Sequence, residues 1–94
     1  MDMRKAVRAY YRGTVQSIFF RQFIKENADK RGVNGFARNL EDGRVEAWFQ
    51  GEPEKVDEMV EVCRTGHKHA MVKNVEVKEE KWQDDFKDFK IFRF

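Results

Sequence analysis

The chain has 94 residues, which is enough for one small domain with a modest hydrophobic core. Its 19 lysine and arginine residues are nearly matched by 17 aspartate and glutamate, so a net charge of +2 gives little support to nucleic-acid binding. No apolar run approaches the ~20 residues that span a bilayer, and the single cysteine cannot form an internal disulfide. We therefore expect one domain over residues 1–94, monomeric and cytoplasmic, with no membrane or nucleic-acid partner.

The first elements in the chain are a strand, a loop and a helix. Apolar and polar residues alternate from Val7 to Tyr11, which predicts a strand with one apolar face. A loop follows from Gly13 to Phe19. The spacing of the next apolar residues predicts a helix with one apolar face, formed by Phe20, Phe23, Ile24 and Ala28. Gly32 is well placed to end this helix.

A hairpin is expected next, with strands from about Asn34 to Leu40 and from Val45 to Gln50. Its turn is Glu41 to Arg44, in which the Asp-Gly pair should supply the positive φ values.

The second helix begins at Pro53, where a missing N–H costs nothing, and ends at Gly66. Its apolar stripe comprises Val56, Met59, Val60 and Cys63. Two more strands are expected, from Met71 to Lys78 and from Phe89 to Phe94. The order β-α-β-β-α-β plus a short terminal strand predicts a ferredoxin-like α+β sandwich, an antiparallel sheet with two helices on one face.

One junction of these elements predicts an anion site. Where the first strand, the loop and the first helix meet, several backbone N–H groups should face outward at the positive end of the helix dipole. The residues that carry them are Val15, Gln16, Ser17, Ile18, Phe19 and Phe20. Arg21 follows on the first helical turn, where a cation opposes the dipole and therefore needs another reason to be present. Its planar guanidinium can bind two phosphate oxygens.

Several ordered motifs resemble the acylphosphatase family. They are Gly13-Thr14-Val15-Gln16-Ser17-Ile18-Phe19-Phe20-Arg21, Gly32-Val33-Asn34-Gly35-Phe36-Ala37-Arg38-Asn39, Asp42-Gly43-Arg44-Val45-Glu46-Ala47 and Gln50-Gly51. The resemblance runs from about Val7 to Phe94. It implies an enzyme that hydrolyses acyl phosphates to a carboxylate and inorganic phosphate, without metal or other cofactor. By the same resemblance Arg21 would bind the phosphoryl oxygens, Asn39 would hold the attacking water, and inorganic phosphate would inhibit as the product.

Ser17 stands where the family usually has glycine. If that position needs a positive φ, a serine costs on the order of 1–2 kcal/mol. We expect a positive φ there, and hence strain that lowers activity. His67 follows Gly66 where a proline is usual, which should affect only the stiffness of the loop.

Two other functions share this topology or this family. An RNA-recognition module would present aromatic rings on the open face of the sheet, with Phe36 and Trp48 as stacking residues. A family member without activity would only bind anions. The remaining titratable candidates have structural interpretations, because His67 and His69 suit a solvated loop and Cys63 completes an apolar stripe.

Overall fold

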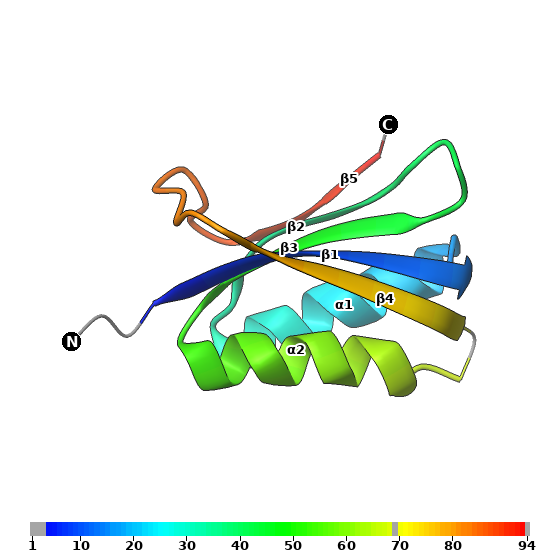
Figure 1. The fold of residues 1–94 in the computed structure, drawn as a ribbon, viewed down its shortest axis with the longest axis horizontal. Coiled ribbons are helices and arrows are strands. Elements are labelled where there is room, and N and C mark those ends of the chain that lie inside the picture. The colour runs from blue at the N-terminus through cyan, green and yellow to red at the C-terminus, as the bar shows by residue number, and fades with distance from the viewer. Residues whose placement is uncertain (1–3, 69, 94) are drawn as a thin grey trace.

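The structure is a computed structural model that describes residues 4–68 and 70–93. Its elements in chain order are β1 (Lys5–Thr14), α1 (Ile18–Arg31), β2 (Asn34–Asn39), β3 (Val45–Gly51), α2 (Pro53–Thr65), β4 (Met71–Glu80) and β5 (Phe89–Phe92). The strands form one sheet in the order β4-β1-β3-β2-β5, and both helices cover the same face of it (Figure 1). The predicted ferredoxin-like α+β fold is confirmed.

The sheet departs from the prediction only at one edge. Antiparallel ladders join β1 to β3 and β4, and β2 to β3. The edge strand β5 instead runs parallel to β2, and the last residue pair of this ladder is Arg38 with Phe92. The carboxyl ends of β2 and β5 therefore lie side by side, at the end of the sheet where α1 begins (Figure 1).

The main core lies between the sheet and the helices. The buried helix residues are Phe20, Ile24, Ala28, Val56, Met59 and Cys63. They pack against inward-facing strand residues such as Tyr11 and Phe49, which are fully buried. Burial raises the pKa of the Cys63 thiol to about 12, so this cysteine is a neutral core residue at physiological pH. The structural interpretation of Cys63 is confirmed.

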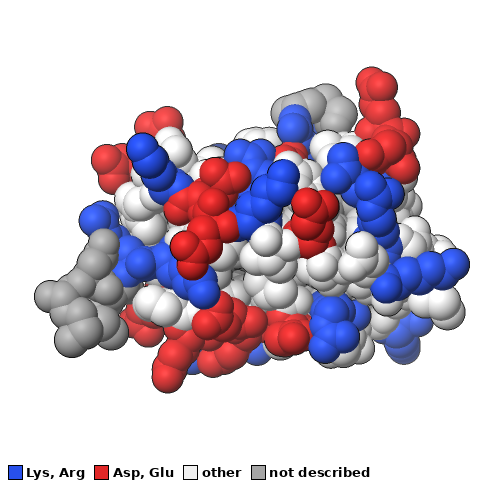
Figure 2. Space-filling view, in the orientation of Figure 1, with Lys and Arg blue, Asp and Glu red and all other residues white. Residues whose placement is uncertain are grey.

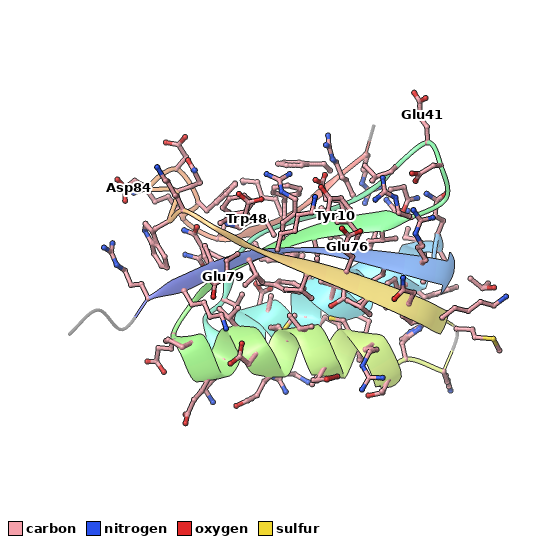
Figure 3. All side chains as sticks on the ribbon, in the orientation of Figure 1. Tyr10, Glu41, Trp48, Glu76, Glu79 and Asp84 are labelled. Atoms are coloured by element: carbon pink, nitrogen blue, oxygen red, sulfur yellow. The ribbon has the colours of Figure 1, made fainter. Side chains whose placement is uncertain are left out.

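The opposite face of the sheet is not covered by the helices, but its large aromatic side chains are not exposed to solvent. Trp48 and Phe36 lie there with 3% and 8% of their surface exposed, and they pack against Phe86 and Phe92. Figure 3 shows Trp48 and Tyr10 on this side, away from the helices. Because their rings are covered, Phe36 and Trp48 cannot stack on bases, and the RNA-binding alternative is wrong about its two stacking residues.

Charges on the open face are paired around one buried carboxylate. Glu46 accepts from Arg8 Nη1 at 2.6 Å and from Arg38 Nε at 2.5 Å. Burial alone raises the pKa of Glu46, but these two guanidinium groups outweigh it and hold that pKa below its ordinary value. Acidic and basic side chains are interspersed on the face of the molecule that Figure 2 shows, in keeping with the small net charge. Among the described residues, no helix is long and apolar enough to cross a membrane.

Two local predictions are wrong. Helix α1 begins at Ile18, two residues before the expected start, because Ser17 caps it. In the β2–β3 turn only Gly43 has a positive φ, 95°, whereas Asp42 does not. The N–H of Gly43 donates to Leu40 O at 3.2 Å and that of Leu40 to Arg44 O at 2.8 Å. This pattern is a turn followed by a glycine bulge, which needs one positive φ and not two.

Candidate functional site

The loop between β1 and α1 is held in shape by its own hydrogen bonds. The N–H of Ser17 donates to Val15 O at 3.0 Å, which closes a γ-turn centred on Gln16. The N–H of Phe20 donates to Ser17 Oγ at 3.1 Å. Within the described part of the chain, the N–H groups of Gln16 and Ile18 have no acceptor. These two donors are available to an anion at the start of the helix.

The backbone conformation of Ser17 is not the strained one that the sequence led us to expect. Its φ is −126° and its ψ 154°, ordinary extended values, and it is the N-cap residue of α1. An N-cap residue needs this conformation, and serine is one of the preferred side chains there because its oxygen satisfies a free helix N–H. The expectation of a positive φ is therefore wrong, and no strain at Ser17 lowers activity. The serine itself was the overlooked signal that the helix begins at Ile18.

The side chain of Gln16 ties this loop to the β2–β3 hairpin. Its Nε2 donates to Leu40 O at 2.6 Å and to Arg44 O at 3.0 Å. These two carbonyls belong to the residues that close the hairpin turn, and Leu40 directly follows Asn39. Gln16 therefore fixes the position of the loop relative to Asn39. From the sequence we predict a role only for the backbone N–H of Gln16, and not for its side chain.

Arg21 and Asn39 meet at one open cavity. The cavity has a volume of about 340 Å³ and is lined by Arg21, Asn39, Phe92 and Arg93. Arg21 comes from the first turn of α1, which carries no acidic residue, and Asn39 from the last position of β2. The structure thus brings together two residues that are far apart in the sequence.

Each of these two residues keeps a buried polar atom without a partner. In residues 4–68 and 70–93, the buried side-chain atoms that lack a hydrogen bond are Arg21 Nε and Asn39 Oδ1. Buried polar groups almost always have partners, so unpaired ones need an explanation such as a missing ligand or water. One is a cationic donor and the other an acceptor. Together they suit an anion next to a polar hydrogen donor.

Sequence reasoning missed Phe92 and Arg93 as residues of this cavity. They lie on β5 and just after it, and they reach the site because β5 runs parallel to β2. Nothing in the local sequence indicates that pairing. The proposed backbone donors, Val15 to Phe20, do lie at the start of α1, although two of their N–H groups are already used within the loop.

The side chain of His67 is not fully solvated. The segment that follows α2 lies at the same end of the molecule as the β1–α1 loop (Figure 1). His67 is half-buried, and its ring centre is 5.0 Å from that of Phe23 and 6.3 Å from that of Phe20. The solvated interpretation is wrong for His67, which packs against Phe20 and Phe23 of α1. His69 lies outside the described residues.

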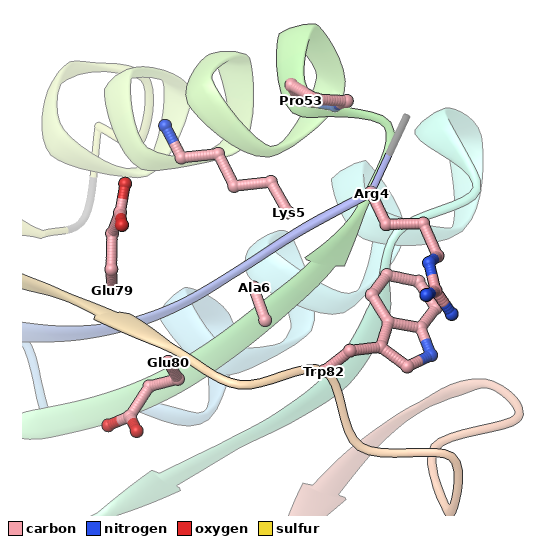
Figure 4. Close-up of a pocket in the computed structure, with 7 residues that line it drawn as sticks. All are labelled: Arg4, Lys5, Ala6, Pro53, Glu79, Glu80 and Trp82. Atoms are coloured by element: carbon pink, nitrogen blue, oxygen red, sulfur yellow. The ribbon is translucent and has the colours of Figure 1, made fainter. Parts of the chain in front are cut away.

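A larger cavity lies at the other end of the sheet. Figure 4 shows it between the start of β1 and the start of α2, with a volume of about 380 Å³. Its Arg4 guanidinium stacks over the Trp82 ring at 5.0 Å. No three metal-ligating side chains gather anywhere in residues 4–68 and 70–93. The unpaired buried atoms of Arg21 and Asn39 line the smaller cavity. We therefore take that cavity as the candidate site, although the one at the other end of the sheet is larger.

Comparison with known proteins shows which family the chain belongs to. The acylphosphatase family model matches residues 7–91, which include Arg21, Asn39 and the whole loop between β1 and α1. The chain belongs to the acylphosphatase family. The predicted enzyme family is thereby confirmed, whereas the roles of individual residues stay predictions.

Individual acylphosphatases match nearly the whole chain. The identity is 48% over 87 residues with an acylphosphatase of Rubrobacter xylanophilus, which covers 93% of this chain and 79% of that protein. It is 43% over 89 residues with an acylphosphatase of Syntrophus aciditrophicus, covering 95% and 93%. The crystal structure of acylphosphatase from Bacillus subtilis is 31% identical and superposes with a TM-score of 0.87, covering 94% of this chain and 98% of that one.

The N-cap role of Ser17 predicts separate effects on stability and on anion binding. Ser17→Ala should lower the free energy of unfolding by about 1 kcal/mol, because the N–H of Phe20 loses its acceptor. Ser17→Asp should keep the cap and the stability, but its charge should weaken phosphate binding at the start of α1. Thermal melts with and without phosphate measure both effects. A Ser17→Gly protein that is more stable than the wild type would contradict this assignment.

Proposed function

We propose that this protein hydrolyses acyl phosphates to a carboxylate and inorganic phosphate at the Arg21–Asn39 cavity. The observation that carries the proposal is the pair of buried atoms without partners, Arg21 Nε and Asn39 Oδ1. Membership of the acylphosphatase family supports the reaction type. The proposed enzyme is a monomeric single domain, and its buried free thiol at Cys63 suits the cytoplasm.

The phosphoryl group would bind where the loop, α1 and β2 meet. Arg21 would donate from its guanidinium to phosphoryl oxygens, and the N–H groups of Gln16 and Ile18 would hold others. Val15 and Phe19 complete the proposed binding loop, and the bonded N–H groups of Ser17 and Phe20 keep its shape. Such donors stabilise the charge that spreads over the equatorial oxygens during phosphoryl transfer.

Asn39 would position the water. Its Oδ1 is a buried acceptor, so it can take a hydrogen bond from a water molecule in the cavity. The oxygen of that water attacks phosphorus while the bond from phosphorus to the acyl oxygen breaks. The carboxylate leaves with the bonding electron pair, and we propose that the transferred phosphate accepts the proton of the water.

We propose that the reaction needs no metal. A carboxylate is a weakly basic leaving group, so an acyl phosphate is already activated and positioning supplies most of the remaining catalysis.

Hydrolysis of benzoyl phosphate, followed in the ultraviolet, tests the reaction and its metal independence together. We expect turnover in excess EDTA at the same rate as without it. Loss of activity in EDTA that a divalent cation restores would contradict the metal-free mechanism. If the protein binds inorganic phosphate but shows no turnover under any condition, it is an anion-binding family member without activity.

Arg21 should contribute most to catalysis among single side chains. Removing one preorganised donor typically costs about 10²–10³ in rate, and a charged donor should cost at least that much. Arg21→Ala should therefore lower kcat/KM by about 10³ or more, and Arg21→Lys should rescue little because an ammonium cannot form the two-point contact. Lys30→Ala, which removes an exposed cation at the far end of α1, is the matched control. A folded Arg21→Ala protein that keeps a tenth of the wild-type rate would remove Arg21 from the mechanism.

Asn39→Ala should lower kcat about 10²-fold with little change in KM, because it would hold water and not substrate. Its dissociation constant for inorganic phosphate should stay within about twofold of the wild type. Asn74→Ala, at an exposed asparagine of β4, controls for the substitution itself. Steady-state kinetics and calorimetry measure both effects. A rise in KM at constant kcat would make Asn39 a substrate contact and refute the assigned role.

A further inference from the structure

We infer that Arg93 is a specificity-determining residue that binds the acyl group of the substrate, which leaves as a carboxylate, an inference that rests on the proposed hydrolysis of acyl phosphates. Arg93 lines the same cavity as Arg21 and Asn39. Two arginines therefore line this cavity, one from the first turn of α1 and one from the residue that follows β5.

The parallel ladder between β2 and β5 explains this position. Arg38 pairs with Phe92, so the next residues along the two strands are Asn39 and Arg93. Residues Ala37 and Asn39 alternate with Arg38, whose side chain lies on the open face with Glu46. The same alternation places Arg93 with Asn39, toward the helix-covered side of the sheet.

Arg93 also borders a second cavity that continues away from the phosphate loop. This space, about 480 Å³, lies between α1 and β5 and is lined by Gln22, Lys25, Glu26, Asp29, Ile91 and Arg93. Arg93 is the residue common to the two cavities. A substituent attached to a phosphate at Arg21 has room to extend past Arg93 into this space.

Of the two cations near this second cavity, Lys25 has partners among the described residues, whereas Arg93 forms no ion pair with any of them. Lys25 Nζ already contacts Asp29 Oδ2 at 3.1 Å and Phe89 O at 2.9 Å. Arg93 is exposed, and none of the carboxylates in the described part of the chain forms an ion pair with it. Its guanidinium is available to a ligand that enters from the α1–β5 side.

The chemistry of the leaving group gives this cation a function. Negative charge develops on the acyl oxygen as its bond to phosphorus breaks, and a guanidinium can bind both oxygens of the resulting carboxylate. The phosphoryl oxygens already have Arg21 and the N–H groups of the loop. Arg93 therefore distinguishes acyl phosphates from phosphate compounds that lack an adjacent carbonyl.

Binding of two stable ligands tests this role without turnover. Benzoylphosphonate carries the carbonyl next to phosphorus, whereas methylphosphonate does not. Arg93→Gln should weaken benzoylphosphonate about tenfold, the size of one charge-assisted hydrogen bond, and should change methylphosphonate less than about twofold. Arg93→Lys should restore part of the loss. Lys90→Gln removes an exposed charge from β5, the strand just before Arg93, and should change neither dissociation constant.

Two results in calorimetry would overturn the inference. Equal weakening of both phosphonates would show that Arg93 contacts the phosphoryl group, and an effect no larger than that of Lys90→Gln would show that it contacts neither. Because both ligands are measured by binding, the outcome stands apart from the proposed reaction. Failure of the wild type to hydrolyse benzoyl phosphate would refute the reaction alone.

Discussion

The site depends on a buried donor and a buried acceptor that the fold brings together and leaves unpaired, Arg21 Nε and Asn39 Oδ1. Leaving such a group unsatisfied costs about 1–3 kcal/mol, and more when it is charged. Rigid packing next to each residue offsets that cost, because Phe20 and Ala37 are fully buried in the main core. A bound anion and its attacking water would satisfy both atoms at once. The hydrogen bonds that the folded protein lacks at these atoms would then contribute to the free energy of binding.

Three chain segments have to be fixed relative to one another for this arrangement to form. The side-chain amide of Gln16 joins the loop before α1 to the hairpin after β2 through Leu40 O and Arg44 O. The Ser17 cap sets where α1 begins and therefore where Arg21 lies. The parallel pairing of β5 with β2 brings Arg93 beside Asn39. The cap is local, whereas the other two contacts join segments that are distant in the sequence, and together the three preorganise the cavity.

Periodicity was sufficient to predict the fold, because the apolar stripes of Phe20, Ile24 and Ala28 and of Val56, Met59 and Cys63 directly mark the buried faces of the helices. The junction at Arg21 was also predictable, since a strand, a loop and a helix start are local features. The errors have other causes. Ser17 looked strained only while the helix was expected to begin later. The burial of Phe36 and Trp48 and the position of Arg93 depend on a C-terminal segment whose pairing no local pattern specifies.

The most direct test is a titration with inorganic phosphate followed by ¹H–¹⁵N correlation spectra of the wild-type protein. We expect the Arg21 Nε–H signal and the backbone amides of Gln16 and Ile18 to shift along one saturable binding curve. Signals around Arg4 and Trp82, at the other cavity, should stay in place. Saturable phosphate binding that shifts the Arg4–Trp82 region and leaves the Arg21 Nε–H signal unchanged would contradict the central claim that the unpaired atoms form the phosphate site.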